Sequence, residues 1–217
     1  MENMKTILMV SFIFILVFCA SIVGSAEEIA PLEGRITSYL ARVMDTNSMQ
    51  IRHDSQLYFA EEFLADTEYA GIPLVSQVAP QAAGREDDGG PEFYIDIDRE
   101  YLTEDDLNLI AFFSDNIVFM KMSGLELLEW MEAATANFNQ IDPDSSQDQF
   151  LVNEEYRDYN FDQFEGVNYI IDVTKPVGER IVEALYNDES LVDLEEVIVV
   201  TNDFRAGGGG DFPNAVE

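Results

Sequence analysis

The segment from Thr201 to Pro213 carries residues suited to contact with a flat ligand. Phe204 and Phe212 stand on either side of four consecutive glycines, Gly207–Gly210. Glycine has no Cβ, so its backbone can adopt a positive φ and approach another group closely. A loop of this kind suits a ligand with a flat face and polar edges. The alternative interpretation is a flexible glycine linker near the end of the chain.

The elements around this segment predict an α+β domain. Val197–Val200 is an unbroken β-branched run, which indicates a buried strand. A strand at 117–122 and an antiparallel hairpin of 167–173 with 181–186 are also expected. Thr103 and Ser123 each begin a capping box that opens a helix. With 217 residues the chain is long enough for a single domain with a mixed or antiparallel sheet and flanking helices.

Two further helices are predicted from apolar spacing. Ile36, Tyr39, Leu40 and Val43 recur at helical intervals within 31–45. A second helix is expected from Ser55 to Ala65, with Ser55 as its N-cap.

Acidic residues dominate the charge. Asp and Glu number 43 against 11 Lys and Arg, which gives a formal net charge of −32. Such a field repels DNA, RNA and anionic lipid, so no nucleic-acid polymer is expected as a partner. A nucleotide ligand needs a local basic group or a metal held elsewhere. Arg85 is a cation among acidic residues, and it either neutralises Glu86 and Asp87 or faces a phosphate.

Cysteine and histidine are too few for the usual metal centres. Cys19 is the only cysteine and His53 the only histidine. This excludes a Cys-based zinc site and multi-histidine centres. We expect His53 to be a surface residue beside Asp54, and we predict no catalytic residue, no metal ligand and no cofactor in this chain.

The first 26 residues have the features of an export signal. Ile7–Val23 is almost wholly apolar, and small residues end at Ala26, which suits cleavage there. The apolar run is slightly longer than most signal cores, so an uncleaved anchor is the alternative, and the only expected link to a membrane. Either form places residues 27–217 outside: periplasmic, on the cell surface or extracellular.

Several sequence blocks together resemble one family. They are Gly89–Tyr94, Ser123–Trp130, Phe138–Ile141, Tyr159–Asp162, Glu165–Tyr169, Ile171–Pro176 and Thr201–Gly208. Their order is similar to the C-terminal, substrate-specificity domain of the secreted 5′-nucleotidase superfamily. Within it, the chain looks most like the bifunctional 2′,3′-cyclic-nucleotide 2′-phosphodiesterase/3′-nucleotidases, which act in nucleotide catabolism.

The resemblance implies a set of substrate-binding residues. Two aromatic rings clamp the base in this family, and the matching positions are Phe113 and Phe204. Stacking on both faces of a base contributes roughly 1–3 kcal/mol per ring. Polar contacts to the base or ribose are implied for Asn202, Asp203 and Asp211. The family's Asn after the first ring corresponds to Asp115 here, with Asn116 one place late, so either Asp115 substitutes or the loop is shifted.

The resemblance covers only part of such an enzyme. The family's metallophosphatase domain, which holds divalent metals, has no counterpart here, and the usual closing C-terminal segment is missing after Pro213. We therefore expect a nucleotide- or nucleoside-recognition domain that is not catalytic alone. The alternatives are a subunit of a split hydrolase, active with a separate metallophosphatase chain, and a degenerate remnant or interaction module.

Overall fold

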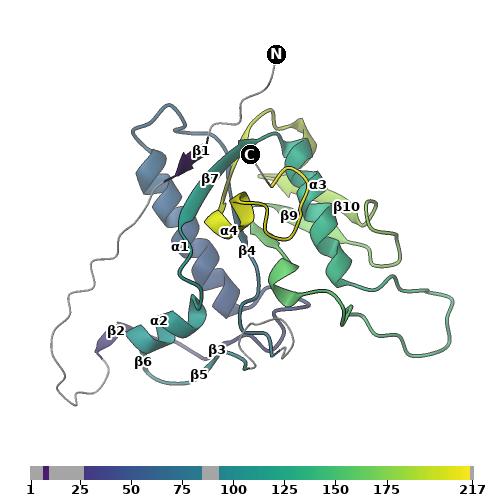
Figure 1. Ribbon diagram of the computed structural model, residues 1–217, viewed down its shortest axis with the longest axis horizontal. Helices are drawn as coiled ribbons and strands as arrows, with labels where there is room; N and C mark the ends of the chain where they lie inside the picture. Colours follow the sequence, from purple (N-terminus) through teal and green to yellow (C-terminus); the bar gives the residue numbers. More distant parts are fainter. Residues whose placement is uncertain (1–6, 10–26, 85–92, 216–217) are drawn as a thin grey trace.

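The computed structural model describes residues 7–9, 27–84 and 93–215 (Figure 1). A mixed five-stranded sheet has the order β1-β7-β12-β4-β8. Only β12 and β4 run parallel, and the other neighbours are antiparallel. The strands are β1 (Ile7–Met9), β4 (Leu74–Val78), β7 (Ile117–Met122), β8 (Gln163–Glu165) and β12 (Val197–Asn202).

Two helices cover opposite faces of this sheet (Figure 1). Helix α3 (Gly124–Ala134) packs with Val197 and Val199 of β12, whereas α1 (Asn47–Leu64) packs with Ile198 and Val200. Successive strand residues point to opposite faces, so both faces of β12 are buried. This burial explains why the strand is apolar at every position from 197 to 200.

Smaller elements surround the central sheet. A three-stranded antiparallel sheet has the order β11-β10-β9, and two strand pairs, β2 with β6 and β3 with β5, lie near α2. Their bounds are β2 (Glu28–Pro31), β3 (Ile36–Thr37), β5 (Asp96–Ile97), β6 (Tyr101–Thr103), α2 (Glu104–Ile110), β9 (Asn168–Ile171), β10 (Ile181–Tyr186) and β11 (Glu189–Ser190). The 3₁₀ turns η1 (Thr135–Asn137), η2 (Asp158–Asn160) and η3 (Leu191–Asp193) and the short helix α4 (Asp203–Ala206) complete the described elements.

Both predicted capping boxes are confirmed. The Thr103 hydroxyl accepts from the backbone N–H of Asp106, whose carboxylate accepts from the Thr103 N–H at 2.9 Å. Ser123 and Glu126 make the same reciprocal pair at the start of α3, with the Ser123 N–H 2.8 Å from the Glu126 carboxylate. The hairpin of β9 and β10 is also antiparallel, as predicted.

The helix predicted over 31–45 is wrong. Ile36 pairs instead with Ile97 in a short β-ladder, and only turns follow it. The Ser38 hydroxyl donates to Ala82 O and accepts from the Ile95 N–H, so this segment is held by distant backbone. Tyr39 and Leu40, which made the spacing look helical, are exposed.

The predicted start of the next helix is also wrong. Helix α1 begins at Asn47, not after Ser55. Ser55 lies inside it and donates to Ile51 O at 2.7 Å, the bond to the i−4 carbonyl that serine makes within helices, whereas an N-cap serine accepts from a backbone N–H.

Most of the predicted export signal lies outside the described residues. Within 1–26 only Ile7–Met9 is described, as an edge strand beside β7. No helix among the described residues combines the length and apolarity needed to span a bilayer.

A buried ion pair joins the last part of the chain to the core. Arg205 of α4 donates to the Asp162 carboxylate at 2.7 Å, and Trp130 of α3 donates to the same carboxylate at 2.8 Å. All three side chains are buried. Burial raises the pKa of Asp162 to about 6, against the opposing effects of Arg205 and Trp130. At neutral pH the carboxylate is therefore mainly ionised and needs its partner.

Arg205→Ala removes that partner and leaves the Asp162 charge buried. We expect it to lower the free energy of unfolding by about 3–5 kcal/mol, the usual cost of breaking a buried pair. Urea unfolding at pH 7.5 measures the loss. The matched control is Arg35→Ala, which breaks a bridge to Asp96 whose arginine is half exposed, and which costs far less because solvent screens it. Equal losses in the two variants would contradict the assignment.

Candidate functional site

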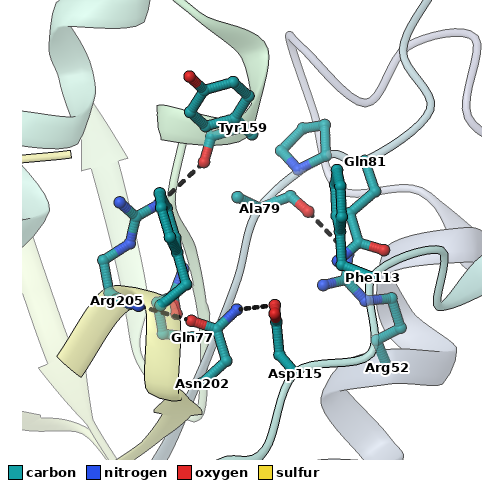
Figure 2. A pocket seen from close by; sticks show the side chains of 11 residues that line it. Arg52, Gln77, Ala79, Gln81, Phe113, Asp115, Tyr159, Asn202 and Arg205 are labelled. Carbon is teal, nitrogen blue, oxygen red and sulfur yellow. Dashed lines mark hydrogen bonds between the residues drawn. The ribbon is translucent and has the colours of Figure 1, made fainter. Parts of the chain in front are cut away.

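A cavity of about 260 Å³ lies beside the carboxyl ends of β4 and β12. We call it the aromatic cavity. Figure 2 shows its lining side chains. They are Arg52, Gln77, Ala79, Pro80, Gln81, Phe113, Asp115, Tyr159, Asn202, Phe204 and Arg205. The volume is below the ~300–1,000 Å³ of drug-sized sites, so a single flat ring suits it better than a bulky ligand.

Phe204 provides one aromatic wall from helix α4. The residue is 49% exposed, and its ring packs edge-on against Tyr159, with the ring centroids 6.3 Å apart. The Arg205 guanidinium carbon lies 5.5 Å from the centroid of the same ring. A phenyl ring held at its edge in this way keeps an apolar face available for stacking.

The glycine run is a packed loop against this wall. A Cβ on Gly209 would lie 2.4 Å from the Phe204 ring, and one on Gly210 would lie 2.2 Å from an Arg205 nitrogen. Gly210 also has a φ of +87°. Arg205 donates to Gly209 O, which closes the loop on its own helix. The glycines therefore serve close packing, and the interpretation as a loose linker does not fit the structure.

Phe113 provides the second aromatic wall from the loop after α2. The residue is 39% exposed. Phe112 packs edge-on against it with centroids 5.2 Å apart, and Phe93 packs edge-on against Phe112 at 6.3 Å. Adjacent residues of an extended segment would face opposite ways, but here the two rings touch and neither enters the core.

Asn202 and Asp115 connect the two walls. The Asn202 side-chain amide donates to Asp115 at 2.8 Å, and its oxygen caps α4 by accepting from the Arg205 N–H at 2.8 Å (Figure 2). Burial, followed by repulsion from Asp203, raises the pKa of Asp115. A raised pKa beside a cavity is typical of a functional carboxyl group.

Asn116 and Asp203 form a second bridge between the same segments. The Asn116 amide donates to the Asp203 carboxylate at 2.6 Å, and the Asp203 N–H donates to Asn116 O at 3.0 Å. Neither side chain lines the aromatic cavity, whereas Asp115 does. Of the two candidates for the family's Asn, only Asp115 therefore lines this cavity, and its role in binding remains a prediction.

Of the other two predicted binding residues, Asp211 is not brought to this cavity, and Arg85 cannot be placed. Asp211 is exposed, with a φ of +54°, and does not line it. Arg85 lies outside the described residues. For both, a role in binding remains a prediction.

Arg52 is a cavity residue that the sequence analysis missed. It comes from α1 and donates to Ala79 O at 2.7 Å (Figure 2). Burial lowers its pKa to about 10, partly offset by Asp115. The scarcity of basic residues is the sequence signal that could have identified Arg52: the chain has only 11 Lys and Arg, so each of them is a candidate for a specific partner. Gln77, Gln81 and Tyr159 carry no comparable sequence signal.

The expectation that His53 lies on the surface is wrong. His53 is buried, and its Nδ1 lies 2.9 Å from the Ser76 hydroxyl on β4. Burial and the neighbouring Arg52 lower its pKa to about 3, so the ring is neutral at physiological pH. Within the described ranges, no group of three or more His, Cys, Asp and Glu side chains is placed to hold a metal ion.

Comparison with known proteins gives this chain a family. The model of the 5′-nucleotidase C-terminal domain matches residues 23–217. The trifunctional nucleotide phosphoesterase protein YfkN of Bacillus subtilis is 36% identical over 200 residues, which are 87% of this chain and 14% of YfkN. The 2′,3′-cyclic-nucleotide 2′-phosphodiesterase/3′-nucleotidase of Yersinia enterocolitica is 31% identical over 199 residues, or 85% of this chain and 30% of that relative.

A solved structure agrees with the fold. The crystal structure of the 5′-nucleotidase precursor from Thermus thermophilus matches with a TM-score of 0.63 at 19% identity, covering 87% of this chain and 32% of that one. The predicted α+β architecture is thus confirmed, and the chain spans about a third or less of these relatives. Because the family model extends over nearly all of its residues, the protein belongs to the 5′-nucleotidase C-terminal domain family.

Proposed function

We propose that this domain recognises a nucleoside or nucleotide by stacking the base between Phe113 and Phe204. The observation that carries the proposal is that these two rings, from segments far apart in the chain, line one cavity. Both rings are partly exposed, so each has surface to offer a ligand. Every base has a π-face, so such a clamp accepts bases broadly and contributes roughly 1–3 kcal/mol per ring.

Polar groups at the cavity then fix the orientation of the base. Asp115 can accept from a base N–H, since its bond to Asn202 uses only part of its acceptor capacity. Asn202 holds Asp115 in place and is itself held by α4. Asp203 and Asn116 support these two residues by locking the loop to the helix.

Hydrolysis is assigned to metals outside this chain. We propose that the domain presents its ligand to a metallophosphatase domain or chain that holds the divalent ions, in a hydrolase of the 2′,3′-cyclic-nucleotide phosphodiesterase/3′-nucleotidase type. The names of the curated relatives support that reaction class. The apolar segment before Ala26 supports an exported location, outside the cytoplasmic membrane.

Phe113→Ala and Phe204→Ala test the clamp. Each removes one stacking face, so we expect each to weaken binding of adenosine or 3′-AMP about 5- to 150-fold, equivalent to about 1–3 kcal/mol. Isothermal titration calorimetry measures the affinity, and circular dichroism checks folding. Phe150→Ala is the control, because Phe150 is 86% exposed and does not line the cavity. Unchanged affinity in both cavity variants would refute the clamp.

Gly209→Ala tests the packing behind Phe204. The new Cβ would collide with the ring and displace it, so we expect binding to weaken a fewfold, equivalent to about 0.5–1.5 kcal/mol for an off-rotamer side chain. The same substitution in the Phe204→Ala background should have no added effect, since no ring remains to displace. An added loss there would show that Gly209 acts by another route.

The isolated chain should release no phosphate from 2′,3′-cyclic AMP or 3′-AMP when Mn²⁺ is added. Metal-assisted hydrolysis needs a ligand set for the metal, and the only histidine is buried against Ser76. A colorimetric phosphate assay follows 3′-AMP hydrolysis directly. For 2′,3′-cyclic AMP, alkaline phosphatase is added afterwards, because it releases phosphate from the monoester product and not from the cyclic diester. Turnover that a chelator abolishes would place catalysis in this chain and overturn the assignment.

A further inference from the structure

Arg52 brings a half-buried positive charge to the aromatic cavity. Its Nη1 donates to Ala79 O at 2.7 Å and lies 4.0 Å from the Met49 sulfur. Both contacts use the same nitrogen. A guanidinium carries five N–H donors in a planar fork, so Nε and Nη2 keep three of them. In the described part of the chain these two nitrogens make no hydrogen bond. Both keep some accessible surface, so a ligand in the cavity can reach them.

Asp115 lines the same cavity but does not neutralise Arg52 directly. The two charges attract each other electrostatically, yet among the described residues they form no ion pair within 4.0 Å. Asp115 is held by Asn202 instead. The cavity is therefore lined by a planar donor fork and a carboxylate acceptor that form no ion pair with each other. A buried charge costs free energy unless a ligand or a partner compensates it.

We propose that Arg52 and Asp115 are the specificity-determining pair of this cavity, and that they select a 6-oxopurine base, guanine or hypoxanthine. The inference rests on the proposed function and adds the base class to it. Guanine presents O6 and N7 as adjacent acceptors, which an arginine fork binds bidentately. Its N1–H lies next to O6 and points a donor towards a carboxylate.

Other bases match this pair less well. Adenine carries an amino group where guanine has O6, so a donor would face the guanidinium donors. Uracil and thymine have an N3–H donor between their two carbonyl oxygens and cannot occupy both prongs of the fork. Cytosine does present adjacent acceptors, N3 and O2, so the selection proposed here is a choice among purine bases. Lysine cannot replace the arginine, because its ammonium is a point charge without the planar fork. The stacking walls themselves contribute affinity to every base and discriminate little.

Calorimetric titration of the wild-type chain with guanosine, inosine and adenosine tests the inference. A bidentate contact discriminates by about 1–3 kcal/mol, so guanosine and inosine should bind roughly tenfold or more tightly than adenosine. Arg52→Ala and Arg52→Lys should each reduce that preference to about twofold or less, and should weaken guanosine binding more than adenosine binding. Arg35→Ala, an equal change of charge at the surface bridge to Asp96, should leave the preference intact.

Three results would overturn the inference. Equal binding of guanosine and adenosine to the wild type, with both weakened by Phe113→Ala, would leave the aromatic clamp standing and remove the base selection. A preference for guanosine that survives in Arg52→Lys would show that another group selects the base. Because lysine keeps the positive charge, this variant still tests the role of the guanidinium fork if Arg52→Ala fails to fold. Failure of every nucleoside to bind a folded wild-type chain would remove the clamp and this inference together.

Discussion

The buried guanidinium of Arg205 is the contact on which the site depends. It reaches Asp162 at 2.7 Å, Tyr159 O at 2.8 Å and the backbone of the glycine loop. A charge in that position needs compensating partners, and these contacts fix the 159–162 segment and the glycine loop against α4. The neighbouring residue, Phe204, is thereby held facing the aromatic cavity. A surface ring is thus positioned by a charge in the core.

The sheet supplies the second constraint. Strands β7 and β12 are antiparallel neighbours, with Asn202 opposite Ile117. The loop before β7 and the helix after β12 therefore lie at the same end of this strand pair. A hydrogen bond from Asn116 to Asp203 joins this loop to α4. A second hydrogen bond, from Asn202 to Asp115, joins the loop to the end of β12 on the cavity side. The distance between the two aromatic walls is therefore set by backbone pairing and by short polar bridges, which are stiffer than loop packing. This stiffness suits recognition, because little ordering entropy remains to be lost on binding.

Local signals in the sequence predicted the elements that depend on local physics. The boxes at Thr103 and Ser123 are closed within four residues, so the sequence suffices to place the starts of α2 and α3. The helix prediction for 31–45 was wrong because this segment is held by distant contacts. Ser38 forms hydrogen bonds with Ala82 and Ile95, and these contacts outweigh the helical spacing of the apolar residues. The cavity position of Arg52 was missed, and His53 was wrongly placed on the surface, for a similar reason. Adjacent on α1, they point to the cavity and to Ser76, and only the packing of that helix on the sheet shows it.

The sequence alone determined the family and the α+β class, because motif order, caps and strand patterning are all legible without contacts. The two candidate stacking rings were implied by the resemblance to the family. Only the tertiary structure decided that the glycine run is packed against Phe204, that Asp115 rather than Asn116 faces the aromatic cavity, and that Arg52 joins it. Each of these depends on atoms brought together from distant segments. Such proximity follows from the pairing of β7 with β12 and from the packing of α1 on the sheet, which no local pattern encodes.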